Sequence, residues 1–364
     1  MPAASADLDV EPDFDPVVDR RQRLTTLIDA ACWCVLVPLV LAALLRGVAG
    51  ESTVETVALR AFTVWLYLPA WCVLALSLGR RRWPLVAAAF GLVMLHLVWV
   101  TPSLRTAEAL PQDVSKVRPV RVVSANLLGV NADTADIARE LREASADIVL
   151  VQEVTDTWAK ALSSREMLEL YPERSLVVRE DSFGIGVMAR HPIAVEVVDF
   201  GVPAMLITLQ VGDAKLSVLH AHTLPPRLIE MVGEWHRMMD RIENEVRRLP
   251  RPLLVAGDLN ATQFSERYER LQALGLRGAH EAVGRGLATT WPNGRFPLPP
   301  IRLDHLLVSD DVSVLDVREG IGRGSDHRPL LAELGLEVLD SSAGRTTSTA
   351  PNLRPSEPSR ESRR

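Results

Sequence analysis

The chain has 364 residues, a length that suits two or three structural units, and 48% of these residues are apolar. That apolar fraction is high for a purely water-soluble protein, and the excess is concentrated between Leu24 and Leu104. The formal net charge of −6 lacks the basic excess that is typical of duplex DNA-binding modules. Composition therefore indicates a membrane segment joined to a water-soluble part, and it disfavours a simple DNA-binding module.

Three long apolar runs lie in the N-terminal part of the chain. They cover Leu24–Leu45, Ala61–Leu78 and Pro84–Val100, and each is close to the roughly 20 residues that cross a hydrocarbon core. The long polar N-terminal tail and the two further runs disfavour a cleaved signal peptide. We therefore predict a polar cytoplasmic tail at 1–23 and a three-span transmembrane region at 24–103.

Arginines near the span ends predict the orientation in the membrane. Arg20, Arg21 and Arg23 precede the first run, and Arg80–Arg82 separate the second run from the third. Positively charged loops stay in the cytoplasm, so both groups belong on that side. We expect a multi-pass protein of the cell membrane with a cytoplasmic N-terminus and an extracytoplasmic domain after Leu104. The lipid bilayer is the expected partner, and no protein partner is evident.

The rest of the chain divides into a linker at 104–118, one large domain at 119–338 and a tail at 339–364. The tail is rich in Ser, Thr, Pro and Arg and has few apolar residues, which predicts disorder. Within the domain, short apolar runs such as Val120–Asn126 read as buried strands, and Pro226–Leu249 reads as a long amphipathic helix. Many strands with a few long helices indicate two packed sheets covered by helices.

Polar side chains occur where several of these strands end. The stretch LLVAGDLNAT is one example, although Gly, Asp and Asn are also ordinary turn residues when taken alone. The residues in question are Asn126, Glu153, His222, Asp258, Asn260, Asp304, Ser325, Asp326 and His327. Carboxylates, amides and histidines of this kind are what a metal-assisted phosphoester hydrolase requires.

The order of the segments SANLLG, VLVQEV, GVMARHPI, HAHTLPP, GDLNAT, RLDHLLVS and GSDHRPLL resembles the endonuclease/exonuclease/phosphatase superfamily. That superfamily includes pancreatic-type deoxyribonucleases and sphingomyelinases. The apolar N-terminal region and the Thr290–Pro292 stretch are similar to a bacterial membrane-anchored branch of it. The resemblance implies a four-layer α/β sandwich, here preceded by three transmembrane helices.

The resemblance also implies a metal site. Asn126 and Glu153 match the strand-end pair that holds the metal, and Asp326 matches a further carboxylate on the metal side. Glu153 is the expected main ligand, because a hard cation favours carboxylate oxygen over amide oxygen. The implied cofactor is Mg²⁺, with Mn²⁺ as a second possibility.

The catalytic residues that the resemblance implies lie in four segments, one of which contains His222. Asp258 matches the residue that orients or deprotonates the attacking water, and Asn260 matches an amide that hydrogen-bonds a phosphate oxygen. Asp304 and His327 match a carboxylate–imidazole pair. The sequence leaves open whether Asp258 or His327 is the base.

Two histidines compete for the contact with the scissile phosphate. His222 matches the family position, and His220 is the second choice because it points to the same face of the strand. We expect Ser325 to be a turn residue that holds Asp326 in place. His305 is expected to be structural, because it alternates with Asp304 along a strand.

These residues predict a magnesium-dependent hydrolase of phosphoester bonds, phosphodiesters first, in the manner of a nuclease. The substrate is expected to be nucleic acid or a phospholipid head group. From Pro119 to Asp340 there are 24 Lys and Arg against 33 Asp and Glu, a balance that disfavours duplex DNA. Ser182 and Phe183 stand where abasic-site endonucleases carry a Tyr, which argues against that specificity. The alternatives are a phospholipid or inositol-phosphate phosphoesterase and an inactive membrane-anchored binding module.

Overall fold

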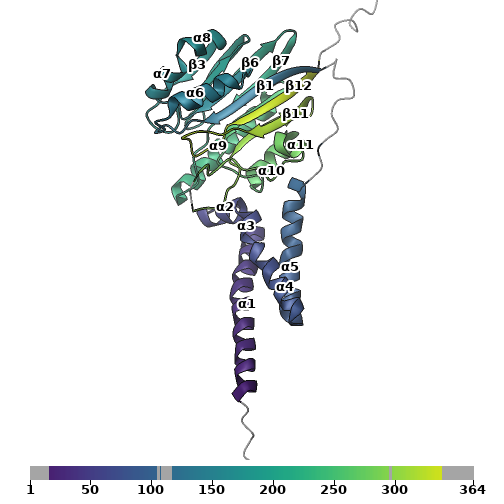
Figure 1. Cartoon of the computed structure of the whole chain (residues 1–364). Coiled ribbons are helices and arrows are strands. Elements are labelled where there is room, and N and C mark those ends of the chain that lie inside the picture. Colours follow the sequence, from purple (N-terminus) through teal and green to yellow (C-terminus); the bar gives the residue numbers. More distant parts are fainter. Residues whose placement is uncertain (1–15, 105–106, 108–116, 295–296, 338–364) are drawn as a thin grey trace, which may run out of the picture.

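The computed structural model describes residues 16–104, 107, 117–294 and 297–337, which form an N-terminal helical part and a C-terminal α/β domain (Figure 1). The predicted tail at 339–364, most of the predicted linker and the first 15 residues lie outside the described residues. The helices of the N-terminal part are α1 (Pro16–Val48), α2 (Val54–Ala61), α3 (Thr63–Leu66), α4 (Leu68–Gly79), α5 (Trp83–Val100) and the short 3₁₀ helix η1 (Thr101–Leu104).

The prediction of three membrane spans is confirmed only in part. In the described part of the chain, two helices are long and apolar enough to cross a membrane, Arg20–Val48 and Trp83–Leu104. The predicted middle span is a bent pair of helices, in which Val54–Ala61 and Thr63–Gly79 meet at 75°. The bend lies at Phe62, which ends α2 with a non-helical ψ of 20°. A third crossing exists only if this bent pair counts as one span.

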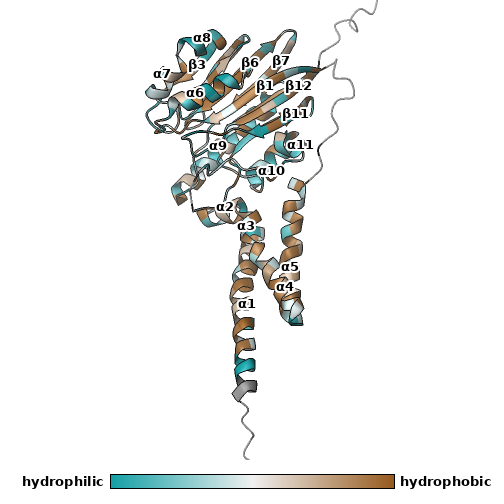
Figure 2. Cartoon of the chain, in the orientation of Figure 1, coloured by the Kyte–Doolittle hydropathy of each residue, from teal (hydrophilic) through white to brown (hydrophobic). Residues whose placement is uncertain are grey.

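Contacts between the helices mark two polar levels along the helical part. Asp29 of α1 forms ion pairs with Arg80 and Arg82 from the loop between α4 and α5. Farther along α1, the guanidinium of Arg46 lies 4.4 Å from the ring centre of Trp99 of α5. A helix rises 1.5 Å per residue, so Asp29 and Arg46 are about 26 Å apart, close to the thickness of a hydrocarbon core. Figure 2 shows that most residues of α1, α4 and α5 between these levels are hydrophobic.

The C-terminal domain contains two six-stranded mixed sheets. The first sheet has the order β11-β12-β1-β2-β4-β3, with strands at Val312–Glu319, Leu330–Glu337, Val117–Asn126, Ile148–Gln152, Ile185–Ala189 and Glu173–Val177. The second has the order β5-β6-β7-β8-β10-β9, with strands at Ile193–Asp199, Pro203–Val211, Ala214–His220, Leu253–Asp258, Asp304–Ser309 and Leu276–Gly278. The pairs β1–β2 and β7–β8 are parallel, and all other pairs are antiparallel.

The two sheets pack face to face, and helices flank them. Apolar side chains of both sheets form one buried cluster between them, which includes Val122, Leu150, Val218 and Leu254. Helices α6 (Thr134–Glu143), α7 (Asp156–Leu162) and α8 (Arg165–Leu170) accompany the first sheet, and α9 (Ile229–Arg248) and α10 (Glu266–Ala273) accompany the second. The short helix α11 (Ala279–Ala282) contacts β10 and β11, and its Ala279 and Ala282 belong to the cluster between the sheets. This arrangement of two packed sheets with flanking helices is the one predicted.

Strand register brings the predicted polar residues to one end of the two sheets. In the first sheet Asn126 pairs with Gln152 at the ends of two parallel strands, so Glu153 follows at the same edge. In the second sheet Asp304 lies opposite Asp258. Strands β1 and β2 of the first sheet both contact β8 of the second, which places the two edges side by side.

Candidate active site

The turn after β8 presents Asp258 and Asn260. Gly257 has φ +133°, and a Cβ atom there would lie 1.9 Å from the carbonyl oxygen of Ala221, so only glycine fits beside the neighbouring strand. Asp258 Oδ1 accepts a hydrogen bond of 3.0 Å from the Asn260 amide, which closes the turn. Asn260 adopts a left-handed φ of 47°, and its side-chain nitrogen donates to the carbonyl of Thr223 at 2.8 Å.

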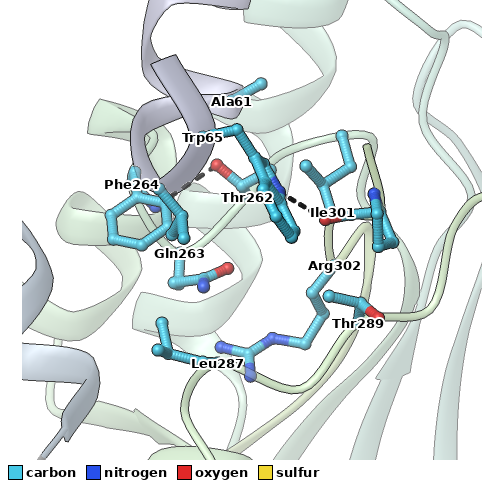
Figure 3. A pocket seen from close by; sticks show the side chains of 11 residues that line it. Ala61, Trp65, Thr262, Gln263, Phe264, Leu287, Thr289, Ile301 and Arg302 are labelled. Carbon is cyan, nitrogen blue, oxygen red and sulfur yellow. Dashed lines mark hydrogen bonds between the residues drawn. The ribbon is translucent and has the colours of Figure 1, made fainter. Parts of the chain in front are cut away.

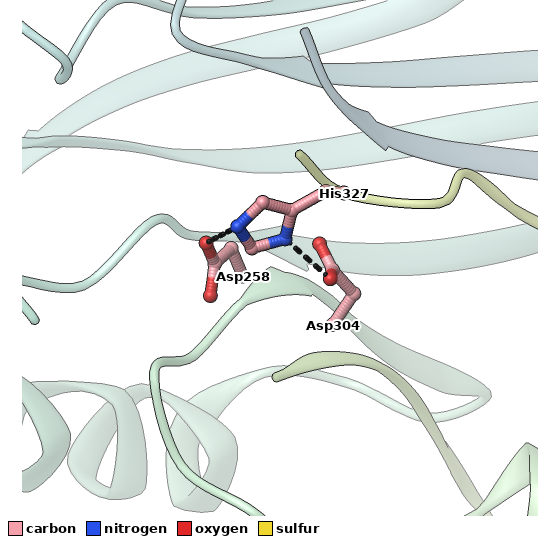
Figure 4. Close-up of side chains that lie close together, drawn as sticks. All are labelled: Asp258, Asp304 and His327. Carbon is pink, nitrogen blue, oxygen red and sulfur yellow. Dashed lines mark hydrogen bonds and ion pairs between the residues drawn. The ribbon is translucent and has the colours of Figure 1, made fainter. Parts of the chain in front are cut away.

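His327 lies between two aspartates (Figure 4). Its Nδ1 is 2.7 Å from Oδ2 of Asp304, and its Nε2 is 3.6 Å from Oδ2 of Asp258. All three side chains are buried. The pair of Asp304 and His327, predicted from two distant segments, is therefore formed, and Asp258 completes a row of carboxylate, imidazole and carboxylate.

This row changes the protonation of its members. Burial alone would lower the pKa of His327, but the carboxylates of Asp304 and Asp258 outweigh it and raise that pKa to about 10. Burial raises the pKa of Asp258, although the nearby imidazoles of His327 and His222 oppose the increase. At neutral pH His327 is thus an imidazolium, and it balances part of the buried negative charge.

Asn126 connects Asp258 to Glu153. Its side-chain nitrogen donates to Glu153 Oε1 at 3.1 Å and to Asp258 Oδ2 at 3.2 Å, so these two carboxylate oxygens are no more than 6.3 Å apart. The second oxygen of Glu153 accepts a hydrogen bond of 2.8 Å from the Gly129 amide. Glu153 has a left-handed φ of 61°, an unfavourable conformation for a long side chain, which the surrounding contacts must stabilise.

Two sets of donors could hold a divalent cation. Asp258, Asp304 and His327 each offer an atom within 4.8 Å of the other two, but the imidazole already bridges the carboxylates. Glu153 and Asn126 offer side-chain oxygens at the same edge, and the amide nitrogen of Asn126 links the carboxylates of Glu153 and Asp258 there. Oxygen donors suit a hard cation, so the residues present fit Mg²⁺, with Glu153 and Asn126 as the better candidates.

The two candidate histidines of the HAH stretch occupy different environments. His222 Nε2 is 3.5 Å from Asp258 Oδ2, and its ring packs on Phe183 with the centroids 5.5 Å apart. Its buried Nδ1 has no hydrogen-bond partner among the described residues. His220 is fully buried in β7, and its Nε2 lies 2.7 Å from Nε2 of Gln152. Burial, with a smaller contribution from His222, lowers the pKa of His220 to about 3, so His220 is a neutral, packed histidine.

The segment Ser325–His327 differs in detail from expectation. Ser325 was expected to hold Asp326, but its hydroxyl donates to the carbonyl of Asn126 at 2.8 Å and accepts from the His327 amide at 3.1 Å. Ser325 therefore links the end of β1 at Asn126 to the backbone of His327. Asp326 instead accepts a hydrogen bond of 3.1 Å from the indole of Trp291.

His305 lies away from this row of polar groups. Its Nε2 is 2.8 Å from the carbonyl oxygen of Ala261, and its ring packs on Tyr268 at 4.8 Å between centroids. Burial lowers the pKa of His305 well below the usual value, so the ring is neutral.

Thr290 is a supporting residue that the sequence did not reveal. Its hydroxyl accepts hydrogen bonds from the amides of Leu303 and Asp304, at 3.1 and 3.2 Å, and so fixes the start of β10. The stretch containing Thr290 and Trp291 was noted only for its resemblance to a bacterial branch. A buried threonine in a loop has no periodic signal that would identify its role.

Comparison with known proteins places this geometry in a family context. The sequence model of the "Endonuclease/Exonuclease/phosphatase family" matches residues 123–327, which is more than half of the chain and includes most of the residues described above. Among curated proteins, none matches the sequence.

Several solved structures are similar to this chain, and the likeness to the first of those named here shows the fold alone. TDP2 from D. rerio, in complex with a single strand DNA product, has a TM-score of 0.50 and 19% identity over 59% of this chain and 98% of that one. Sphingomyelinase C from Streptomyces griseocarneus has a TM-score of 0.45 and 18% identity over 59% and 99% of the two chains. An endonuclease/exonuclease/phosphatase from Beutenbergia cavernae DSM 12333 has a TM-score of 0.47 and 18% identity over 60% and 72%.

Proposed function

This chain belongs to the endonuclease/exonuclease/phosphatase family of metal-dependent phosphoesterases, and from that premise we propose that it hydrolyses phosphodiester bonds with Mg²⁺. The observation that carries the proposal is the row of Asp258, His327 and Asp304 beside the pair of Asn126 and Glu153. Such a site combines a buried base, a cationic hydrogen-bond donor and oxygen ligands for a hard cation.

The protonation states assign the roles. His327 is already protonated at neutral pH, so it cannot take a proton from water. Asp258, whose pKa is raised by burial, is the better base, and we assign it to orient and deprotonate the attacking water. The imidazolium of His327, held by Asp304, then stabilises negative charge that develops on the phosphate oxygens.

Asn260 and His222 complete the contacts to the substrate. Both lie beside Asp258, where their side chains can donate hydrogen bonds to a phosphate oxygen. Mg²⁺ held by Glu153 and Asn126 would neutralise charge on the phosphate and on the leaving oxygen, and Asp326 is the further carboxylate that we propose for the metal side. Water attacks in line with the leaving oxygen, and that oxygen departs from the face opposite to Asp258.

We further propose that the enzyme is a multi-pass protein of the cell membrane, with its catalytic domain outside the cytoplasm. The ion pairs of Asp29 with Arg80 and Arg82 support this topology, because they bring the arginine loop to the level of the first turns of the membrane helix. The arginines that precede the first membrane helix and those of the loop Arg80–Arg82 then lie on the same, cytoplasmic side.

The test is hydrolysis by the purified full-length protein in detergent. Bis(p-nitrophenyl) phosphate, single-stranded DNA and sphingomyelin vesicles are compared with Mg²⁺ and with EDTA. Hydrolysis that needs Mg²⁺ and disappears in Asp258→Asn supports the proposal, and equal rates with EDTA contradict it. Turnover of sphingomyelin alone selects the phospholipid alternative, which the membrane helices favour. If none of the substrates is hydrolysed with Mg²⁺ or Mn²⁺, the result favours the inactive binding module.

A further inference from the structure

The helical part does not merely tether the catalytic domain, because it contributes to the domain's hydrophobic core. Val57 of α2 is buried in the cluster that covers the second sheet, together with Trp235, Leu259 and Ala261. Leu259 stands between Asp258 and Asn260 in the catalytic turn. A residue of the N-terminal helical part (16–104), called the anchor below, therefore shares the hydrophobic cluster into which this turn packs.

Glu51, between α1 and α2, caps a helix of the catalytic domain. Its Oε2 accepts a hydrogen bond of 2.8 Å from the Ser265 hydroxyl and one of 3.1 Å from the Glu266 amide, at the first turn of α10. Glu51 is only 3% exposed, and a carboxylate is favourable at a helix N-terminus. The loop between Asn260 and Ser265 is thus held at its far end by the anchor.

Two arginines of the helical part strengthen this contact. Arg60 of α2 forms an ion pair with Glu266, and Arg46 at the end of α1 donates to the carbonyl oxygen of Phe264 at 3.5 Å. Both arginines are buried. Contacts with α1, α2 and the intervening Glu51 therefore all converge on the segment Phe264–Glu266.

A second catalytic loop is held in the same way (Figure 3). The indole nitrogen of Trp65 in α3 donates a hydrogen bond of 2.9 Å to the carbonyl oxygen of Pro300. Trp65 also lines a small pocket with Phe264, Ile301 and Arg302, so anchor and catalytic domain meet there. Only three residues separate Pro300 from Asp304, the residue that orients His327.

We propose that Glu51 and Trp65 are positioning residues of the active site. Glu51 holds the loop that follows Asp258, and Trp65 holds the loop that precedes Asp304. The inference rests on the proposed function. Loops are usually the mobile parts of a fold, and displacement of a reacting group by about 1 Å costs up to about a hundredfold in rate. Contacts from the anchor supply the rigidity that the bare loops lack.

The kinetic test uses Glu51→Ala, Glu51→Gln and Trp65→Phe in the full-length protein, with bis(p-nitrophenyl) phosphate and Mg²⁺. One oxygen of Glu51 accepts both hydrogen bonds, so the amide oxygen of Gln can replace it. We expect kcat to fall about tenfold to a hundredfold in Glu51→Ala and at least threefold in Trp65→Phe, with KM changed less than twofold. Glu51→Gln should keep kcat within about threefold of the wild type. Glu169→Ala removes an exposed glutamate from α8 and serves as the matched control.

Amide hydrogen exchange supplies a readout that does not depend on activity. In Glu51→Ala, we expect at least fivefold faster exchange in 261–267 than in the wild type. In Trp65→Phe, we expect the same increase in 301–304, and in both variants the exchange in the first sheet should be unchanged. Unchanged exchange in these loops overturns the proposal even if kcat falls. If the wild type hydrolyses nothing, the proposed function fails, while the exchange rates still decide whether the anchor holds the loops.

Discussion

Asp304 Oδ2 lies 2.7 Å from Nδ1 of His327, whereas the other ring nitrogen, Nε2, faces Asp258. The imidazole is therefore fixed in orientation and charged, and this is the main determinant of how the site uses protons. The imidazole of His327 lies beside the carboxylates of both Asp304 and Asp258, so its positive charge offsets their mutual repulsion in a buried place. The assignment of Asp258 as base follows from this relationship.

Replacing Asp304 with Asn should therefore change the pH dependence as well as the rate. The wild-type pKa of about 10 for His327 predicts that activity persists until the pH approaches that value. Loss of the Asp304 charge lowers this pKa, so the alkaline limb of the kcat profile should move toward neutral pH, and kcat at pH 7 should fall about 10²- to 10⁴-fold. An unshifted alkaline limb in Asp304→Asn would assign that limb to another group.

The same raised pKa predicts how stability depends on pH. A histidine with a higher pKa in the folded state contributes stability that is complete below its unfolded pKa of about 6.5 and is lost as the pH rises through about 10. Wild-type Tm should therefore decline between pH 7 and 10 more steeply than that of His327→Gln. Thermal unfolding in detergent at several pH values measures the difference, and parallel curves would contradict the prediction.

Much of the fold and the site could be predicted from the sequence, because both depend on local patterns. The apolar strands that end in Asn126, Glu153 and Asp258 indicated a shared edge, and register brings these residues together. The bend at Phe62 was missed, because apolar composition does not distinguish a straight helix from a broken one.

The other features that the sequence did not predict depend on tertiary contacts. Alternation along a strand predicts the same face for His220 and His222, so it does not distinguish their roles. The structure distinguishes them, because β7 ends at His220 and His222 lies beyond the strand. Glu51 and Trp65 have no local signal at all. Their partners Ser265 and Pro300 are more than 200 residues away, so only the folded chain reveals their contacts.

Glu153→Ala should abolish most of the metal-dependent hydrolysis. Loss of the carboxylate removes the main oxygen donor, so we expect kcat at saturating Mg²⁺ to fall by about 10³-fold. Glu153→Asp shortens the side chain but keeps the charge, and should retain more activity when Mg²⁺ is raised. Titration of activity with Mg²⁺ in both variants checks this. Wild-type Mg²⁺ dependence in Glu153→Ala would place the metal at Asp258, Asp304 and His327 instead.

Gly257→Ala tests the close approach that shapes the catalytic turn. A Cβ atom at this position would lie 1.9 Å from the Ala221 carbonyl oxygen, so the two strands must separate or the variant must unfold. We expect a loss of about 3 kcal/mol or more in the free energy of unfolding. Gly233→Ala is the control, because it lies inside helix α9 with only ordinary contacts and should stabilise the protein by about 0.5–1 kcal/mol. Equal Tm values for the two variants would contradict the steric argument.

The catalytic domain cut from the chain at about Pro119 should be less stable than the full-length protein. Its core loses Val57, whose burial contributes about 1.5–3 kcal/mol, and Glu266 loses its ion pair with Arg60. A change of 1 kcal/mol shifts the Tm of a domain of this size by about 2–4 °C, so we expect the cut domain to melt at least about 4 °C lower. Adding Val57→Ala to the full-length protein should reproduce part of the decrease. A cut domain with the Tm and the loop hydrogen exchange of the intact protein would show that the anchor is only a tether.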